Sequence, residues 1–168
     1  MTDNFEFQEN RLERFFDNPV FDLVLGFFED VLGFAVQSDP VKGVVKGLLD
    51  GNPFWCVVRP RSEIVGFKSV LPFVIPEDTL PQVVEGVARI NRQLLVGNLG
   101  VDFENLRVLC GTGGDVEHFQ HDINNWMHST VMGPNVAIVA HYTPILAAIA
   151  YGGASPEIVD SEDQLDAN

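Results

Sequence analysis

The sequence predicts an α+β domain in which helices pack on a mostly antiparallel sheet of about five strands. Two stretches of the chain lead to this prediction. Between Leu80 and Leu95, apolar residues recur at helical spacing, and polar residues fill the other side of the helix. Between Leu99 and Cys110, the spacing changes to the alternation that is typical of a strand pair. The expected order of elements along the chain is α-β-β-β-α-β-β-α-α.

One domain is expected over residues 18–154, between an N-terminal arm at 1–17 and an acidic flexible tail at 155–168. A length of 168 residues and a hydrophobic content of 46% are enough for one buried core. The arm mixes acidic residues with phenylalanines, so we expect it to pack on its own or a neighbouring subunit. The tail is rich in aspartate and glutamate, which is typical of a solvated chain end.

The first helix is expected to begin at Pro19 and to end near Gly33. Asn18 can accept hydrogen bonds from the free amides of the first turn, and proline is favourable at the first helical position. A broad stripe of apolar residues along this stretch predicts that one side of the helix is buried.

Three strands are expected after the first helix. Turn signals separate them, and the clearest is the sequence DGNP at 50–53. The run FWCVV is apolar throughout, which is typical of a strand buried on both faces. Gly66 and Pro72 indicate a bulge or a sheet edge in the third strand. The predicted strand ranges are 41–49, 54–58 and 64–75.

The central helix is expected to begin after Pro76, with Asp78 or Thr79 capping its first amides. Gly97 can adopt the left-handed conformation that ends a helix. A two-residue turn at Glu104-Asn105 then brings like residues opposite each other in a hairpin. The expected pairs are Leu99 with Cys110, Val101 with Val108, Phe103 with Leu106, and Asp102 with Arg107.

The C-terminal third is expected to be helical. The sequence GTGG at 111–114 predicts an interruption of the sheet, followed by a helix from Asp115 to about Val131. Gly133-Pro134 is expected to end that helix. A last helix then runs to Gly152, bent or delayed by Pro144.

The charge balance limits the possible partners. The net charge is −14, from 24 acidic and 10 basic residues, which disfavours binding to nucleic acids and anionic membranes. It suits a soluble protein, or one that prefers basic segments of a protein partner. The first residues lack the pattern of a signal peptide, and no apolar run approaches the ~20 residues of a membrane span. The expected compartment is therefore the cytoplasm.

No cluster of residues compels an enzymatic function, and no cofactor is expected. Cys56 and Cys110 lie in apolar runs, so we expect buried, reduced thiols. His118 and His121 share one side of a predicted helix and are a weak candidate for a metal site. The motif HEXXH is absent, and the alternative is a solvated helix face. The GTGG sequence lacks the lysine and the spacing of a phosphate-binding loop.

Two segments resemble the YbjN-like family of bacterial sensory transduction regulators: ARINRQLLVGNLGVDFENLRVLCGT at 88–112 and HYTPILAAIAYGGASPEIV at 141–159. This family shares the fold of the type III secretion chaperones. The resemblance implies a small acidic homodimer that binds another protein. In the chaperones, partners lie as extended segments across apolar patches and sheet edges, where main-chain pairing gives affinity with little demand on sequence.

The first hypothesis is therefore a non-enzymatic protein-binding module, chaperone-like or regulatory. The second is a small-molecule or metal-binding sensor with a pocket near Trp126, His118 and His121. For the first hypothesis, the residues of both candidate surfaces could instead form the monomer core. The candidate dimer interface comprises Val83, Val87, Ile90 and Leu94, and the candidate partner-binding residues are Phe54, Trp55, Val65 and Phe67, with the N-terminal aromatic residues.

Overall fold

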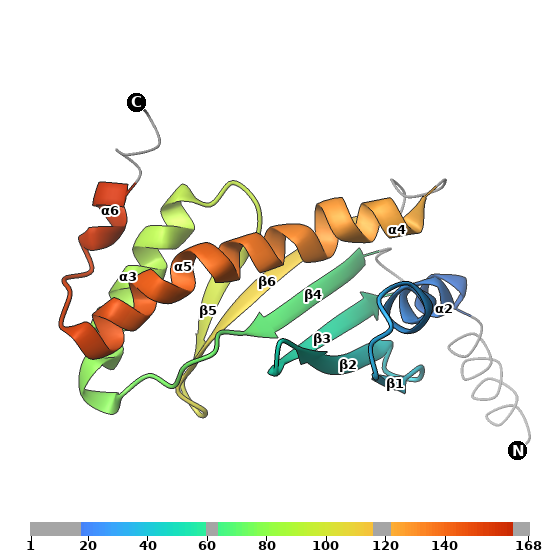
Figure 1. The fold of residues 1–168 in the computed structure, drawn as a ribbon, viewed down its shortest axis with the longest axis horizontal. Coiled ribbons are helices and arrows are strands. Elements are labelled where there is room, and N and C mark those ends of the chain that lie inside the picture. Colours follow the sequence, from blue (N-terminus) through green and yellow to red (C-terminus); the bar gives the residue numbers. More distant parts are fainter. Residues whose placement is uncertain (1–17, 60–63, 116–121, 163–168) are drawn as a thin grey trace, which may run out of the picture. The chain divides into compact units, whose positions relative to one another are not determined.

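The computed structural model describes residues 18–59, 64–115 and 122–162. These residues divide into two compact units. Unit 1 comprises the chain up to Phe67 together with Gly113–Val131, and unit 2 comprises Lys68–Thr112 together with the chain from Met132 onward. The boundary between the units falls within two of the strands. The single domain expected over residues 18–154 stays a prediction. Figure 1 labels the helices and strands.

The described residues form an α+β fold whose sheet has six strands, in the order β1-β2-β3-β4-β6-β5. The pairs β1–β2, β2–β3 and β5–β6 are antiparallel. The predicted fold class is confirmed, but the predicted count of about five strands is wrong. The additional strand is β1, which is three residues long and mostly polar, so it carries no alternating pattern. The strands are β1 (Gln37–Asp39), β2 (Val44–Leu49), β3 (Asn52–Arg59), β4 (Ile64–Val70), β5 (Asn98–Asp102) and β6 (Arg107–Asp115).

The helical segments before and between the strands follow the predicted order, but the two predicted C-terminal helices form one continuous helix, and a further short helix follows it. Two of the helical segments are π-helical turns, in which the backbone is wider than in an α-helix. They are α2 (Pro19–Gly26), η1 (Phe27–Val31), η2 (Glu77–Thr79), α3 (Leu80–Gln93), α4 (Ile123–Trp126), η4 (Met127–Met132), α5 (Gly133–Gly152) and α6 (Ile158–Glu162).

In unit 1, α2 begins as the sequence predicted. The Asn18 side chain accepts hydrogen bonds from the amides of Val20 and Phe21, at 3.2 and 3.3 Å. The π-helical turn η1 then buries the consecutive residues Phe27 and Phe28. The ring of Phe28 stacks on that of Phe54, with 5.1 Å between the centroids. Stacked aromatic rings therefore join the first helical segment to the inner face of the sheet.

The GTGG sequence does not interrupt the sheet, because β6 runs through it to Asp115. A Cβ atom at Gly113 would lie 2.7 Å from the backbone oxygen of Val65, and one at Gly114 would lie 2.8 Å from Cζ2 of Trp126. These glycines let a neighbouring strand and an indole ring approach the backbone closely. The predicted helix from Asp115 is therefore wrong at its start, and the described helix begins at Ile123.

The predicted break at Gly133-Pro134 is also wrong, because η4 continues into α5. Pro134 lies at the start of α5, where a missing amide proton costs little. Pro144 lies inside α5, and its ring is exposed. The helix Ile123–Gly152 has a mean hydropathy of 1.3 in its most apolar 18-residue window, so by length and composition it could cross a membrane. The buried core helix of a soluble protein meets the same criterion.

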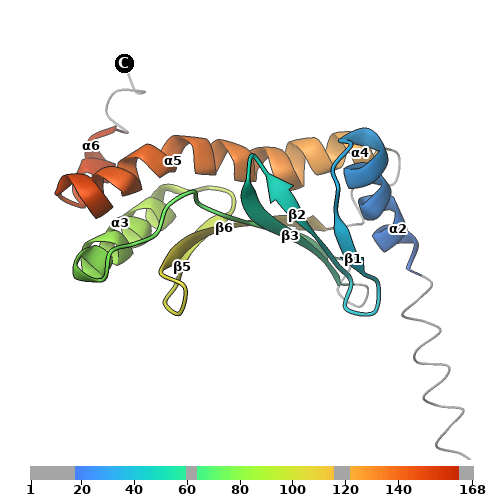
Figure 2. The ribbon, with the colours of Figure 1, turned by 60° about the horizontal axis from the view of Figure 1, so that its bottom comes forward.

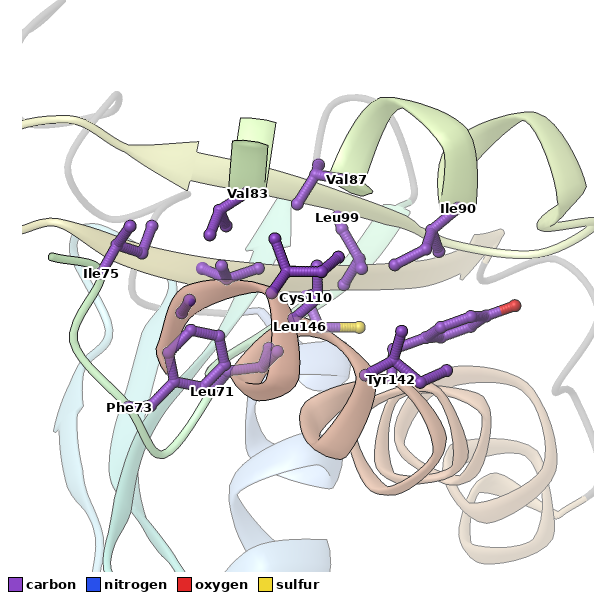
Figure 3. Close-up of a cluster of buried hydrophobic side chains, with 14 of the residues drawn as sticks. Leu71, Phe73, Ile75, Val83, Val87, Ile90, Leu99, Cys110, Tyr142 and Leu146 are labelled. Carbon is purple, nitrogen blue, oxygen red and sulfur yellow. The ribbon is translucent and has the colours of Figure 1, made fainter. Parts of the chain in front are cut away.

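Unit 2 has its own core, to which α3, β5, β6, α5 and α6 contribute. In Figure 3, side chains from α3 and α5 point toward those of the β5–β6 hairpin. The predicted hairpin register is confirmed for Leu99–Cys110, Val101–Val108 and Asp102–Arg107. The turn is longer than predicted, because residues 103–106 lie outside the paired strands and Leu106 has a φ of 51°.

The acidic C-terminal segment differs from the expected flexible tail as far as it is described. Gly153 ends α5 in the left-handed conformation, with a φ of 67°. The chain then forms α6, and Pro156 and Val159 are buried. The few apolar residues among the acidic ones account for this difference, because Val159 belongs to the core of unit 2 and Ile158 packs against it.

Candidate functional site

The four candidate partner-binding residues lie on opposite faces of the sheet in unit 1. Phe54, Val65 and Phe67 are at most 1% exposed. The rings of Phe54 and Phe67 stack with 5.2 Å between their centroids. These three residues form part of the core and are not available to a partner in this structure. Trp55 points the other way from β3 and is only half-buried.

Trp55 belongs to a partly exposed apolar surface, which we call the outer face of unit 1. Alternation along β2, β3 and β4 places its members on the side opposite Phe54 and Cys56. Trp55 lies opposite Lys46 in the sheet register, and Val57 lies opposite Val44. The outer face of unit 1 comprises Val44, Lys46, Leu48, Trp55, Val57 and Ile64.

The exposure of this surface is unusual for its residue types. Leu48 is 61% exposed and Ile64 is 44% exposed, whereas leucine and isoleucine are usually buried. Around a half-buried indole, such residues make a surface that can lose water on contact with another protein. Basic side chains also lie at this surface, from Lys46 on β2 and from Arg59 on the side of β3 that carries Trp55. Both could pair with acidic groups of a partner at the rim.

The candidate dimer interface is mostly buried within unit 2. Val83 and Ile90 are 0% exposed and Val87 is 6% exposed, and all three belong to the core in Figure 3. Leu94 is partly buried against the same core. These residues thus face the chain's own sheet and α5, and they do not form an open surface. In the loop directly after α3, Leu95 is 99% exposed and Val96 is 52% exposed.

The two edges of the sheet differ in how open they are. The strand β1 at one edge is short, with three residues. The strand β5 at the other edge is partly closed by Asn91 of α3. The Asn91 side chain donates a hydrogen bond to the Leu99 oxygen at 2.9 Å and accepts one from the Leu99 amide at 2.8 Å. A partner strand therefore cannot pair with Leu99 unless Asn91 moves.

The thiols are unsuited to nucleophilic catalysis. Cys56 and Cys110 are both 0% exposed. Burial raises the pKa of each thiol to about 12, so both remain protonated near neutral pH. The cysteines are structural, because a reactive cysteine needs a lowered pKa and access to solvent.

The metal-site hypothesis stays a prediction. His118 and His121 lie outside the described residues. Within the described ranges there is no group of three or more histidine, cysteine, aspartate or glutamate side chains that could hold a metal ion. The ring of His128 packs edge-on against Phe27, at 5.2 Å between the centroids.

Comparison with known proteins gives a match only at the level of structure. No protein-family model and no curated protein matches the sequence. A chain of the ExsC–ExsE complex aligns with a TM-score of 0.60 and 16% identity, covering 76% of this chain and 92% of that chain. A chain of the HopA1–SchA chaperone–effector complex aligns with a TM-score of 0.52 and 12% identity, covering 74% and 93%.

A third structure, of the proposed transcription regulator YbjN from E. coli, aligns with a TM-score of 0.42 and 12% identity, covering 77% of this chain and 86% of that chain. The alignments with the two complexes define the class of fold. The chain has the type III secretion chaperone-like fold that the sequence resemblance predicted.

Proposed function

We propose that the chain is a non-enzymatic, chaperone-like protein that binds another protein in the cytoplasm. The observation that carries the proposal is its structural likeness to a chain of the HopA1–SchA chaperone–effector complex, at a TM-score of 0.52. The likeness to a chain of the ExsC–ExsE complex supports it, since that structure is also a complex of two proteins. The exposed apolar residues of unit 1 offer such a partner a surface.

The partner contacts the outer face of unit 1, with Trp55 as the central anchor. Large aromatic residues surrounded by smaller apolar ones contribute much of the free energy of binding at protein interfaces. An extended partner segment could lie along the outer face, because the side chains of an extended chain point alternately to two sides and one set can contact the sheet. A net charge of −14 favours a partner that is basic overall and speeds its association at low salt, whereas Lys46 and Arg59 favour acidic groups where the partner meets the rim of the outer face.

Affinity capture from the source cells tests this function. The tagged full-length chain is compared with Trp55→Ala and with the control Phe103→Ala, which removes an aromatic side chain that is 64% exposed in unit 2. We expect a protein that is enriched by the wild type and by Phe103→Ala but lost with Trp55→Ala. Equal enrichment by all three would contradict a partner site at Trp55.

The chain also acts as a homodimer in this proposal, through exposed residues that follow α3. A leucine that is 99% exposed, as Leu95 is, gains from burial against a second copy. Sedimentation equilibrium of the wild type is expected to give a dimer at micromolar concentration. Leu95→Asp is expected to give a monomer, whereas Val136→Asp, at a residue that is 40% exposed on α5, should leave the dimer intact. A monomeric wild type would exclude the dimer.

A further inference from the structure

The helix α6 lies beside α3 within unit 2 (Figure 1), next to the C-terminal end of α5 (Figure 2). Its anchor is Val159, which is 2% exposed and belongs to the core of the unit. Pro156, just before the helix, is also buried, and Ile158 packs partly against the same core. The segment thus fills an apolar site beside α3 with two buried side chains three positions apart.

Charge holds the same segment in place. The Arg89 guanidinium of α3 contacts Glu157 at 3.3 Å and also pairs with Asp160. Arg92, one turn further along α3, lies 3.7 Å from the other carboxylate oxygen of Asp160. The only acidic partner of Arg89 on its own helix is Glu85, at 2.7 Å. Without α6, this surface would carry two positive charges and one negative charge, in a chain whose net charge is −14.

The segment has little stability of its own. The helix α6 has five residues, which is too few for a helix to persist without packing. It is joined to α5 through Gly153, in the left-handed conformation, and the four residues 154–157. Its position therefore depends on the contacts with α3 and the core. Those contacts consist of the two buried side chains of Pro156 and Val159 and a few ion pairs. A competing segment with similar contacts could therefore replace α6.

We propose that the α3 surface beneath α6 is a docking site for a short helical segment of a partner protein. That segment has aliphatic residues flanked by carboxylates, and α6 is the internal competitor that occupies the site until the partner replaces it. The chain's own sequence Pro-Glu-Ile-Val-Asp at 156–160 shows the chemistry that the site accepts. This site lies in unit 2 and does not involve Trp55, so it goes beyond the function proposed above.

A labelled peptide with the sequence of residues 154–162 serves as the probe, and its fluorescence anisotropy is measured against full-length protein. The wild type should bind it weakly, because α6 already fills the site. The variant Val159→Gly with Asp160→Asn should bind it at least about tenfold more tightly. In this variant α6 leaves the α3 surface more often, so the site is free for the peptide in a larger fraction of molecules. Adding Arg89→Ala to that variant should abolish the gain, and a scrambled peptide should not bind.

A milder variant covers the case in which Val159→Gly impairs folding. Glu157→Gln with Asp160→Asn leaves the buried anchor in place and should still increase peptide binding about two- to threefold, with an effect that shrinks as salt is added. Trp55→Ala should bind the peptide as the wild type does, so a failure at α3 is distinct from a failure of the outer face.

Three outcomes would overturn the proposal. They are equal peptide binding by the wild type and both α6 variants, a gain that survives Arg89→Ala, and a dimeric wild type that the peptide converts to monomers. The last result would assign the surface to α6 of a second copy instead of a different protein.

Discussion

The Asn91 side chain on α3 forms two hydrogen bonds with the backbone of Leu99 on β5. Its Nδ2 atom donates to the Leu99 oxygen at 2.9 Å, and its Oδ1 atom accepts from the Leu99 amide at 2.8 Å. An amide side chain thus takes the place of a neighbouring strand at the sheet edge. Unpaired backbone groups at an edge invite pairing with other chains, so Asn91 both fixes the position of α3 and protects this edge.

Asn91→Ala is expected to lower the free energy of unfolding by about 1 kcal/mol, because two hydrogen bonds are lost while alanine favours the helix. Gln82→Ala, at an exposed position of the same helix, is the control and should not lower the free energy of unfolding. Urea unfolding monitored by circular dichroism measures both. We also expect Asn91→Ala to self-associate more readily. An unchanged midpoint would show that the two hydrogen bonds contribute nothing measurable.

A second amide links α5 to the sheet of unit 2. Asn135 is 0% exposed, accepts a hydrogen bond from the Ser69 hydroxyl and donates one to the Cys110 oxygen at 3.0 Å. Asn135→Ala should lower the free energy of unfolding by about 2–4 kcal/mol, because the Ser69 hydroxyl and the Cys110 oxygen each lose their hydrogen bond to Asn135. Thermal unfolding compares it with Asn124→Ala, at an exposed position of α4. Equal melting temperatures would refute a structural role for Asn135.

Local patterns in the sequence predicted the parts of the fold whose contacts are close in the chain. The pairing of Leu99 with Cys110 follows from alternation on both sides of a short turn, and the cap at Asn18 follows from the residue itself. Ser69 and Asn135 lie 66 positions apart, so no local pattern indicates that they meet. A buried asparagine in an apolar helix can be expected only once its partner is known.

The partner-binding residues could not be separated from the core for a related reason. The run FWCVV is apolar on both faces of β3, so alternation does not distinguish the buried Phe54 from the half-exposed Trp55. Only the stacking of Phe54 on Phe28 and Phe67 identifies the inner face. Burial of α3 likewise depends on α5, which is remote in the sequence. The stripe from Val83 to Leu94 therefore indicated an apolar side without showing what covers it.

Two glycines of the sheet are expected to respond differently to alanine. A Cβ atom at Gly113 would meet the Val65 oxygen at 2.7 Å, whereas one at Gly100 would have no atom within 4 Å. Gly113→Ala should therefore destabilise the fold by about 1–3 kcal/mol, because two backbones must move apart. Gly100→Ala should be neutral. Chemical unfolding of both variants measures the difference, and equal stabilities would contradict the close approach of β4 and β6.

The buried thiols give a prediction for stability at alkaline pH. Burial raises the pKa of Cys56 and Cys110 to about 12, from an ordinary value of 9.0. The neutral thiols therefore contribute stability below pH 9, and this contribution is lost as the pH rises toward 12, because only the unfolded chain ionises easily. A double Cys→Ala variant should show a shallower loss of stability over this range. If the unfolding free energy fell equally steeply with pH in the wild type and the variant, the raised pKa of the two thiols would be contradicted.

The same burial predicts slow modification of both thiols in the native protein. A disulfide reagent such as DTNB should react with them at pH 8 only after unfolding by guanidinium. The release of the coloured thiolate is followed with and without denaturant. Rapid reaction of either cysteine in the native state would show that it is accessible.

The most direct test of the proposed function is a calorimetric titration of the captured partner into purified full-length chain. We predict that Trp55→Ala weakens the binding constant about tenfold or more, as expected for a central aromatic anchor, and that Phe103→Ala leaves it unchanged. We also predict that the partner is recovered without chemical change. Equal affinities for the wild type and Trp55→Ala, or a partner that the chain converts to a product, would contradict a non-enzymatic binding protein acting through the outer face of unit 1.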